Sequence, residues 1–154
     1  MNTYQLLGHI NNKIRSKVGY ASVLSYDKFM KLNLNQLKLP AAIIVNTKPA
    51  YERGQHWFSV FITESKLAYL NSLKCSPKIC NSLFRKLNQS GKKIEYLNNR
   101  IQSEYSNTCG MYCLVFLMSM IIHGDFMKFS SLFRYNNFKY NENVIKSLYY
   151  KYFH

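Results

Sequence analysis

The stretch Gln102-Ser-Glu-Tyr-Ser-Asn-Thr-Cys109-Gly-Met-Tyr-Cys113 decides the fold, because it sets a polar turn directly before an apolar segment that begins at a cysteine. The apolar run continues to Ile122, and His123-Gly124 is typical of a helix end. The run is too short to cross a bilayer, which takes roughly 20 residues. We therefore expect a buried helix with Cys109 at its N-terminus.

A cysteine at a helix N-terminus is suited to nucleophilic chemistry, because the helix lowers the thiol pKa from about 8.5 toward ~3.5–7.5. Gly110 would leave room for a substrate backbone, and Thr108 or Asn107 could cap the helix. The backbone N–H of Cys109 and the side chain of Gln102 could donate to the same oxyanion. The pattern predicts a thiol nucleophile with an oxyanion-hole donor, and the alternative is that Cys109 is a small buried residue.

The remaining cysteines do not indicate a disulfide framework or a metal site. Four cysteines, at positions 75, 80, 109 and 113, are too few and too clustered for a secreted disulfide scaffold. Cys75 and Cys80 lack the Cys-x2-Cys spacing of common zinc sites, so we expect no metal. We assign Cys113, one turn deeper in the apolar helix, to the core.

His56, in Gly54-Gln55-His56-Trp57, is the histidine best placed to act as a general base, because it stands at the start of an apolar strand. Asn71 follows the next predicted strand and could hold the far side of the imidazole, as the amide does in Cys-His-Asn sites. The alternative for Asn71 is a turn residue at a strand end. Trp57 is expected to be mainly a packing residue.

Periodicity predicts an α+β fold with a mainly antiparallel central sheet packed against the Cys109 helix, in a single domain spanning residues 1–154. Trp57–Ile62 and Lys66–Leu70 are expected to be neighbouring strands of a hairpin. The other expected elements are a helix over about residues 3–14, strands at Ala41–Asn46 and Lys93–Leu97, a helix from Ser76-Pro77 to about Gly91, and a final helix near Glu142–Tyr152.

The chain carries 21 basic and 7 acidic residues, a net charge of +14. An AT-rich genome would enrich lysine but would not deplete glutamate, so a polyanion partner, most simply DNA, is favoured over a merely solvated surface. The first residues show no secretory signal, which predicts an intracellular protein. The candidate DNA contacts are Lys13, Arg15, Lys17, Lys128, Arg134, Lys139, Lys146 and Lys151.

These motifs together resemble the adenovirus-type cysteine endopeptidases, the adenain family, which are distantly similar to proteases of ubiquitin-like modifiers. The resemblance runs in the family's order from Tyr26 to Leu117. It is carried by Tyr26-Asp27-Lys28-Phe29, Leu39-Pro-Ala-Ala-Ile-Ile-Val-Asn-Thr47, a Gly-x-His-Trp signature at Gly54-Gln55-His56-Trp57, and a Gln-x6-Cys-Gly block from Gln102 to Cys113.

The resemblance implies a catalytic His56, a nucleophile Cys109 and an oxyanion donor Gln102. It also implies cleavage of viral capsid or core precursors at Gly-Gly or Gly-x-Gly sites, with DNA as a possible cofactor, in the virion and in the infected-cell nucleus or viral factory. We expect a monomer with no membrane partner. Asn71 stands where the family has an acidic residue. Residues 91–100 lack the cysteine that captures an activating peptide by a disulfide, so any such peptide would bind without one.

Two alternatives remain open at the level of the sequence. The first is a deconjugating protease that acts on ubiquitin-like tails ending in Gly-Gly. The second is a non-catalytic DNA-binding protein on a protease-like fold, which the charge and Asn71 would suit.

Overall fold

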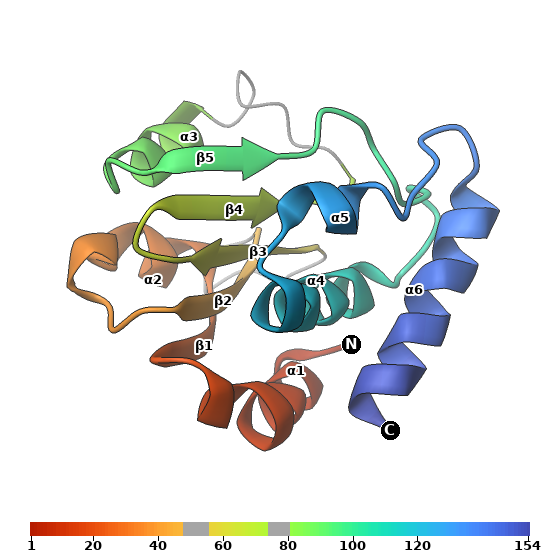
Figure 1. The fold of residues 1–154 in the computed structure, drawn as a ribbon, viewed down its shortest axis with the longest axis horizontal. Coiled ribbons are helices and arrows are strands. Elements are labelled where there is room, and N and C mark those ends of the chain that lie inside the picture. The colour runs from red at the N-terminus through yellow and green to blue at the C-terminus, as the bar shows by residue number, and fades with distance from the viewer. Residues whose placement is uncertain (48–55, 74–80) are drawn as a thin grey trace.

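The computed structural model describes residues 1–47, 56–73 and 81–154, and Figure 1 shows the arrangement of the elements. A π-helical turn at Ile10–Ile14 and a 3-10 turn at Arg15–Lys17 follow the first helix, and another 3-10 turn spans Leu34–Gln36. The elements are α1 (Thr3–His9), β1 (Tyr20–Leu24), α2 (Tyr26–Lys31), β2 (Ala41–Asn46), β3 (Trp57–Ile62), β4 (Lys66–Leu70), α3 (Asn81–Asn88), β5 (Lys93–Tyr96), α4 (Cys109–His123), α5 (Phe126–Ser130) and α6 (Phe138–Phe153).

The five strands form one sheet in the order β1-β2-β3-β4-β5. The central strands β2, β3 and β4 pair antiparallel, while β1 joins β2 and β5 joins β4 in parallel. The predicted hairpin of β3 and β4 is present, with Ser59 opposite Leu70. The expected α+β class, with a sheet packed on the Cys109 helix, is confirmed.

Both faces of the sheet are covered, which explains why its central strands are nearly continuous apolar runs. Along β2, Ala42 and Ile44 face the layer that contains α1, α4 and α6. Ile43 and Val45, which alternate with them, face the layer that contains α2 and α3. The candidate site lies on the first of these two sides.

The helix α4 is the central element of its layer and is buried along most of its length. It packs against β3 on one side and against α6 on another, and Figure 1 shows α6 passing one end of α4 at a steep angle. Gly124 ends the helix at φ 65°, a left-handed conformation that favours glycine. Both predicted ends of this helix are therefore confirmed.

Other boundaries differ from the prediction for local reasons. The last helix begins at Phe138 rather than near Glu142, because the Asn137 side chain accepts from the Tyr140 N–H and caps it there. Sequence patterning did not predict β1, α2 or α5, which are short. The predicted helix from Ser76-Pro77 lies partly outside the described residues, and its described part is α3.

Within the described ranges, none of the helices combines the length and apolar character that a membrane crossing requires. The same residues contain no group of three or more histidine, cysteine or acidic side chains that could hold a metal ion.

Candidate active site

The side chains of His56 and Asn71 meet at one end of the β3–β4 hairpin. His56 immediately precedes β3 and Asn71 immediately follows β4, so the antiparallel register brings the two residues together. The His56 Nε2 atom lies 2.6 Å from the Asn71 Oδ1 atom. Asn71 thus has the contact that the sequence predicted for a residue that orients the imidazole.

The hydrogen bonds of Asn71 determine which ring nitrogen of His56 carries the proton. Asn71 Oδ1 also accepts from the Leu73 backbone N–H at 3.1 Å, and its Nδ2 donates to the Tyr69 hydroxyl at 3.3 Å. A backbone N–H only donates, so the oxygen of the amide must face both Leu73 and His56. The His56 Nε2 atom therefore carries the proton, and Nδ1 presents a lone pair.

The free ring nitrogen has the properties of a buried general base. His56 Nδ1 is buried and has no hydrogen-bond partner among the residues that the structure describes. Burial lowers the pKa of His56, and the hydrogen bond to Asn71 opposes that effect by raising it. The neutral imidazole is therefore favoured at neutral pH and can accept a proton.

Cys109 is the first residue of α4 and is only 6% exposed. The backbone N–H groups of Trp57, the residue that follows His56, and of Gly110 act to lower the pKa of its thiol. The start of β3 thus influences the thiol at the start of α4.

The prediction of a lowered thiol pKa is wrong for this arrangement. Burial raises the pKa of the Cys109 thiol, while the hydrogen bonds from Trp57 and Gly110 lower it by a smaller amount. The helix N-terminus therefore moderates the cost of burying the charge rather than overcoming it. Burial thus favours the neutral form of both the Cys109 thiol and the His56 imidazole.

The space beside Gly110 is filled, which contradicts the expectation that it stays open for a substrate backbone. A Cβ atom at Gly110 would lie 3.2 Å from Met1 Cβ and 3.3 Å from Leu6 Cδ2. The indole of Trp57 donates to the Met1 carbonyl at 3.3 Å. Glycine at this position allows Met1 and α1 to pack closely on α4.

Gln102 is fully buried on the loop before α4. Its Oε1 accepts from the Ser72 hydroxyl at 2.5 Å, and its Nε2 donates to the Ser106 carbonyl at 3.1 Å. The Ser72 carbonyl also accepts from the backbone N–H groups of Ile101 and Gln102, each at 3.0 Å. The amide orientation is thereby fixed, and these contacts use one of the two amide hydrogens.

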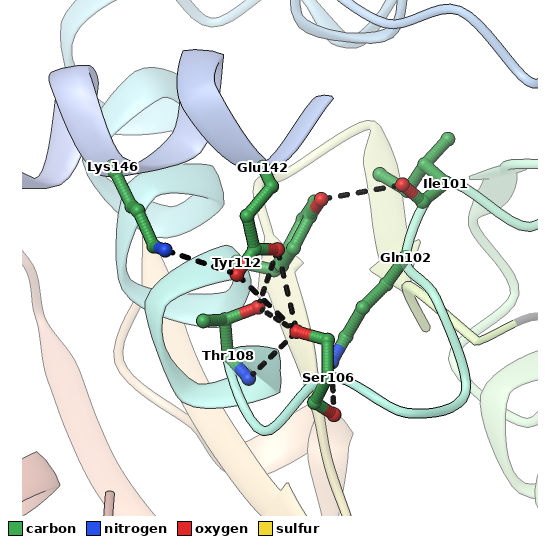
Figure 2. Close-up of polar contacts among 7 residues, drawn as sticks. All are labelled: Ile101, Gln102, Ser106, Thr108, Tyr112, Glu142 and Lys146. Atoms are coloured by element: carbon green, nitrogen blue, oxygen red, sulfur yellow. Dashed lines mark hydrogen bonds and ion pairs between the residues drawn. The ribbon is translucent and has the colours of Figure 1, made fainter. Parts of the chain in front are cut away.

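Thr108 occupies the N-cap position of α4, but its side chain does not cap the helix, contrary to one of the two predicted options. Its hydroxyl instead donates to Glu142 Oε2 at 2.8 Å. Figure 2 shows this carboxylate reaching from α6 to Ser106 and Thr108 on the loop that leads from Gln102 to α4. The loop before the nucleophile is thus held by a side chain of α6.

Sequence reasoning missed Ser72, Ser106 and Glu142. Ser72 is next to Asn71, so its closeness to the site was within reach of the same strand-end argument. Glu142 is one of only seven acidic residues in a chain of net charge +14, which was a weak signal that it has a specific role.

The other predicted site residues lie apart from this cluster. All eight candidate DNA contacts are exposed. Lys13, Arg15 and Lys17 lie in the turns after α1, Lys128 lies in α5, Arg134 lies in the loop after it, and Lys139, Lys146 and Lys151 lie in α6. Trp57 and Cys113 are buried, as predicted for packing residues. The positions Gly54, Gln55, Cys75 and Cys80 lie outside the described residues.

No protein-family model matches the sequence, and no curated protein matches it. Matches among solved structures include an ASFV protease at TM-score 0.41 and 21% identity, covering 68% of this chain and 44% of that one. ChlaDub1 from Chlamydia trachomatis matches at TM-score 0.45 and 15% identity, and the match covers 75% of this chain and 62% of that one. The SUMO protease Ulp1, with its catalytic cysteine oxidised to a sulfinic acid, matches at TM-score 0.41 and 13% identity. The match covers 100% of this chain and 69% of that one.

This chain thus spans 44% and 62% of the length of the first two structures. Structural similarity at TM-scores below 0.5 is too weak to support a function. The function of this chain therefore has to be inferred from the geometry of its own site. The resemblance to adenovirus-type endopeptidases stays a prediction.

Proposed function

We propose that this chain is a thiol endopeptidase with Cys109 as nucleophile, His56 as general base, Asn71 as the residue that orients it, and Gln102 as oxyanion donor. The observation that carries the proposal is the hydrogen bond from His56 Nε2 to Asn71, 2.6 Å long, which leaves Nδ1 buried and without a partner among the described residues. A base that is oriented from its far side and a cysteine at a helix N-terminus are the two groups that thiol acyl transfer requires.

The reaction begins from the neutral pair. His56 Nδ1 accepts the thiol proton as the Cys109 sulfur attacks the carbonyl carbon of the scissile peptide bond. The resulting oxyanion accepts hydrogen bonds from Gln102 Nε2 and from the Cys109 backbone N–H. The imidazolium then gives its proton to the leaving amine, and the same imidazole activates a water molecule that hydrolyses the thioester.

Replacing Cys109 by alanine tests the proposal. With a fluorogenic Gly-Gly peptide, we expect Cys109→Ala to lower cleavage by a factor on the order of 10⁵ or more, because the nucleophile is removed. Cys113→Ala is the matched control, since Cys113 lies one turn deeper in the same helix and is 1% exposed. Unchanged cleavage in Cys109→Ala would refute the proposal.

The substrate class is the finer part of the proposal. Viral capsid or core precursors with Gly-Gly or Gly-x-Gly sites are proposed because the Gly-x-His-Trp and Gln-x6-Cys-Gly motifs resemble those of adenovirus-type enzymes. Comparing purified precursor with a ubiquitin-like fusion ending in Gly-Gly separates the two protease alternatives. Cleavage of the fusion alone would replace virion maturation by deconjugation.

DNA stimulation is proposed on the strength of the net charge of +14 and eight exposed basic side chains on the turns after α1, on α5 and the loop after it, and on α6. Contacts to phosphates release counterions, so binding weakens steeply as salt rises. Added duplex should raise the cleavage rate, and salt should cancel the increase. A rate that responds to neither would assign these side chains to the solvated surface.

A further inference from the structure

Glu142 lies in the first turns of α6, and its side chain is 21% exposed. Its carboxylate lies between α6 and the loop from Gln102 to Cys109, and Figure 2 shows it facing Ser106 and Thr108. The Thr108 hydroxyl donates to Oε2 at 2.8 Å, and the Ser106 hydroxyl lies 3.3 Å from each carboxylate oxygen. A residue 34 positions from Thr108 in sequence thus contacts the residue before the nucleophile.

The hydrogen bonds around this carboxylate run in one direction. The Thr108 backbone N–H donates to Ser106 Oγ at 3.3 Å, and the two hydroxyl oxygens lie 2.6 Å apart. With the Thr108 hydroxyl donating to the carboxylate, the Ser106 hydroxyl is the one that donates to Thr108. Chains of aligned hydrogen bonds polarise one another, and a charged acceptor at the end strengthens each link.

The same loop is connected to Gln102 through its backbone. Ser106, whose hydroxyl belongs to the chain of hydrogen bonds, accepts from Gln102 Nε2 through its carbonyl. Next to Glu142 on α6, the buried Asn141 donates to the Ile101 carbonyl at 3.0 Å. Two successive residues of α6 therefore hold the loop at both ends, before Gln102 and before Cys109.

We propose that Glu142 is a positioning residue for catalysis, acting through Ser106 and Thr108 to hold the Gln102 amide and the start of α4 in register. This inference rests on the proposed protease function and adds to it a residue of α6, far from Cys109 in sequence. Glu142 itself touches neither thiol nor imidazole. Its contribution should therefore appear in the step that uses the oxyanion hole and not in substrate binding.

Three substitutions test this assignment by steady-state kinetics on the full chain. We expect Glu142→Ala to lower kcat by about 10- to 100-fold with KM within about twofold, since it removes a charged acceptor of hydrogen bonds. Glu142→Gln keeps an acceptor oxygen for Thr108 and should recover most of the lost rate. The matched control is Asn143→Ala, the exposed residue that follows Glu142 on α6.

A double substitution identifies the route of the effect. In a Gln102→Ala background, the kcat cost of Glu142→Ala should shrink to about threefold or less, because the two residues act as a unit. An equal cost in both backgrounds, or wild-type kcat in Glu142→Ala, would overturn the proposal. If Glu142→Ala does not fold, Thr108→Val removes the hydroxyl that reaches the carboxylate and should lower kcat in the same direction.

A readout without turnover separates this inference from the proposed function. In a ¹⁵N spectrum, the shift difference between the two Gln102 side-chain amide protons should be larger in the wild type than in a free glutamine side chain, because one of them donates to Ser106. Glu142→Ala should reduce this difference and speed the exchange of the amide protons, whereas Asn143→Ala should do neither. A wild-type chain that cleaves nothing would refute the protease, while an unchanged Gln102 amide in Glu142→Ala would refute the positioning role.

Discussion

The two halves of the candidate site are built in different ways. His56 and Asn71 are 15 positions apart and meet because adjacent antiparallel strands end side by side. Gln102 and Cys109 lie on a loop and a helix start, and their supports come from elsewhere in the chain. Ser72 is 30 positions from Gln102, and Glu142 is 36 positions from Ser106.

The difference shows how a scaffold can fix a side chain. The pairing register of a hairpin places the residues at its end within reach of each other without further contacts. A loop has no register, so each of its functional groups needs a side-chain anchor on a rigid element. The base half, His56 and Asn71, should therefore tolerate changes around it better than the oxyanion half, Gln102 and Cys109, does.

The largest predicted effect separates the two halves chemically. His56→Ala should lower peptide cleavage by a factor on the order of 10⁴ or more, because no base takes the thiol proton. It should also slow alkylation of Cys109 by iodoacetamide at neutral pH, since burial raises the pKa of the thiol and keeps it protonated. Cleavage and alkylation are measured on the same preparation.

Gln102→Ala is the comparison for that experiment. Cleavage should fall by ~10²–10³-fold, as expected for loss of one oxyanion donor, while alkylation, which forms no oxyanion, should be unchanged. His123→Ala, an exposed histidine at the other end of α4, should alter neither rate. Equal losses in alkylation for His56→Ala and Gln102→Ala would contradict the division into two halves.

The next prediction tests the role of Asn71, the neutral residue that contacts His56. Asn71→Asp places a carboxylate against His56 Nε2 and should raise the pKa of His56, which burial now lowers. A higher imidazole pKa increases the share of thiolate–imidazolium at neutral pH, so alkylation of Cys109 should become faster by up to about tenfold. At low pH the imidazole is charged in both proteins, and their rates should converge.

The direction in which the alkylation profile shifts follows from the protonation state of His56. Raising the pKa of His56 moves the acid limb of the alkylation profile to higher pH, because the imidazole now gains its proton earlier on acidification. Asn71→Ala removes the hydrogen bond that raises the pKa of His56, so its acid limb should move to lower pH and its plateau should fall. An acid limb that moves the same way in both variants would show that residue 71 does not act on the imidazole.

The sequence predicted the two halves of this site to different extents. Strand spacing located β3 and β4 and placed His56 and Asn71 at their ends, because local periodicity determines hairpin geometry. The apolar run after Cys109 located α4, and its polar turn identified Gln102. The supports of the loop were not predictable, because a contact between Ser106 and α6 depends on how separate elements pack.

Burial explains the two remaining errors. Neither the raised thiol pKa nor the filled space at Gly110 follows from local sequence. The raised pKa depends on the burial of Cys109, and the filled space depends on α1, whose residue Leu6 packs against the start of α4. A periodic pattern indicates which face of α1 is apolar, but it does not indicate which helix that face covers.

The smallest predicted effect concerns Ser72, which borders both halves. Ser72→Ala removes the hydroxyl that donates to Gln102 Oε1 but keeps the carbonyl that holds the backbone of Ile101 and Gln102. Loss of one neutral hydrogen bond of about 0.5–1.5 kcal/mol should lower kcat roughly 3- to 10-fold. The pH profile of alkylation should not change, although Ser72 is adjacent to Asn71. A shifted profile would mean that the strand end serves the imidazole as well, and an unchanged kcat would leave the Ser106 carbonyl as sufficient support for the Gln102 amide.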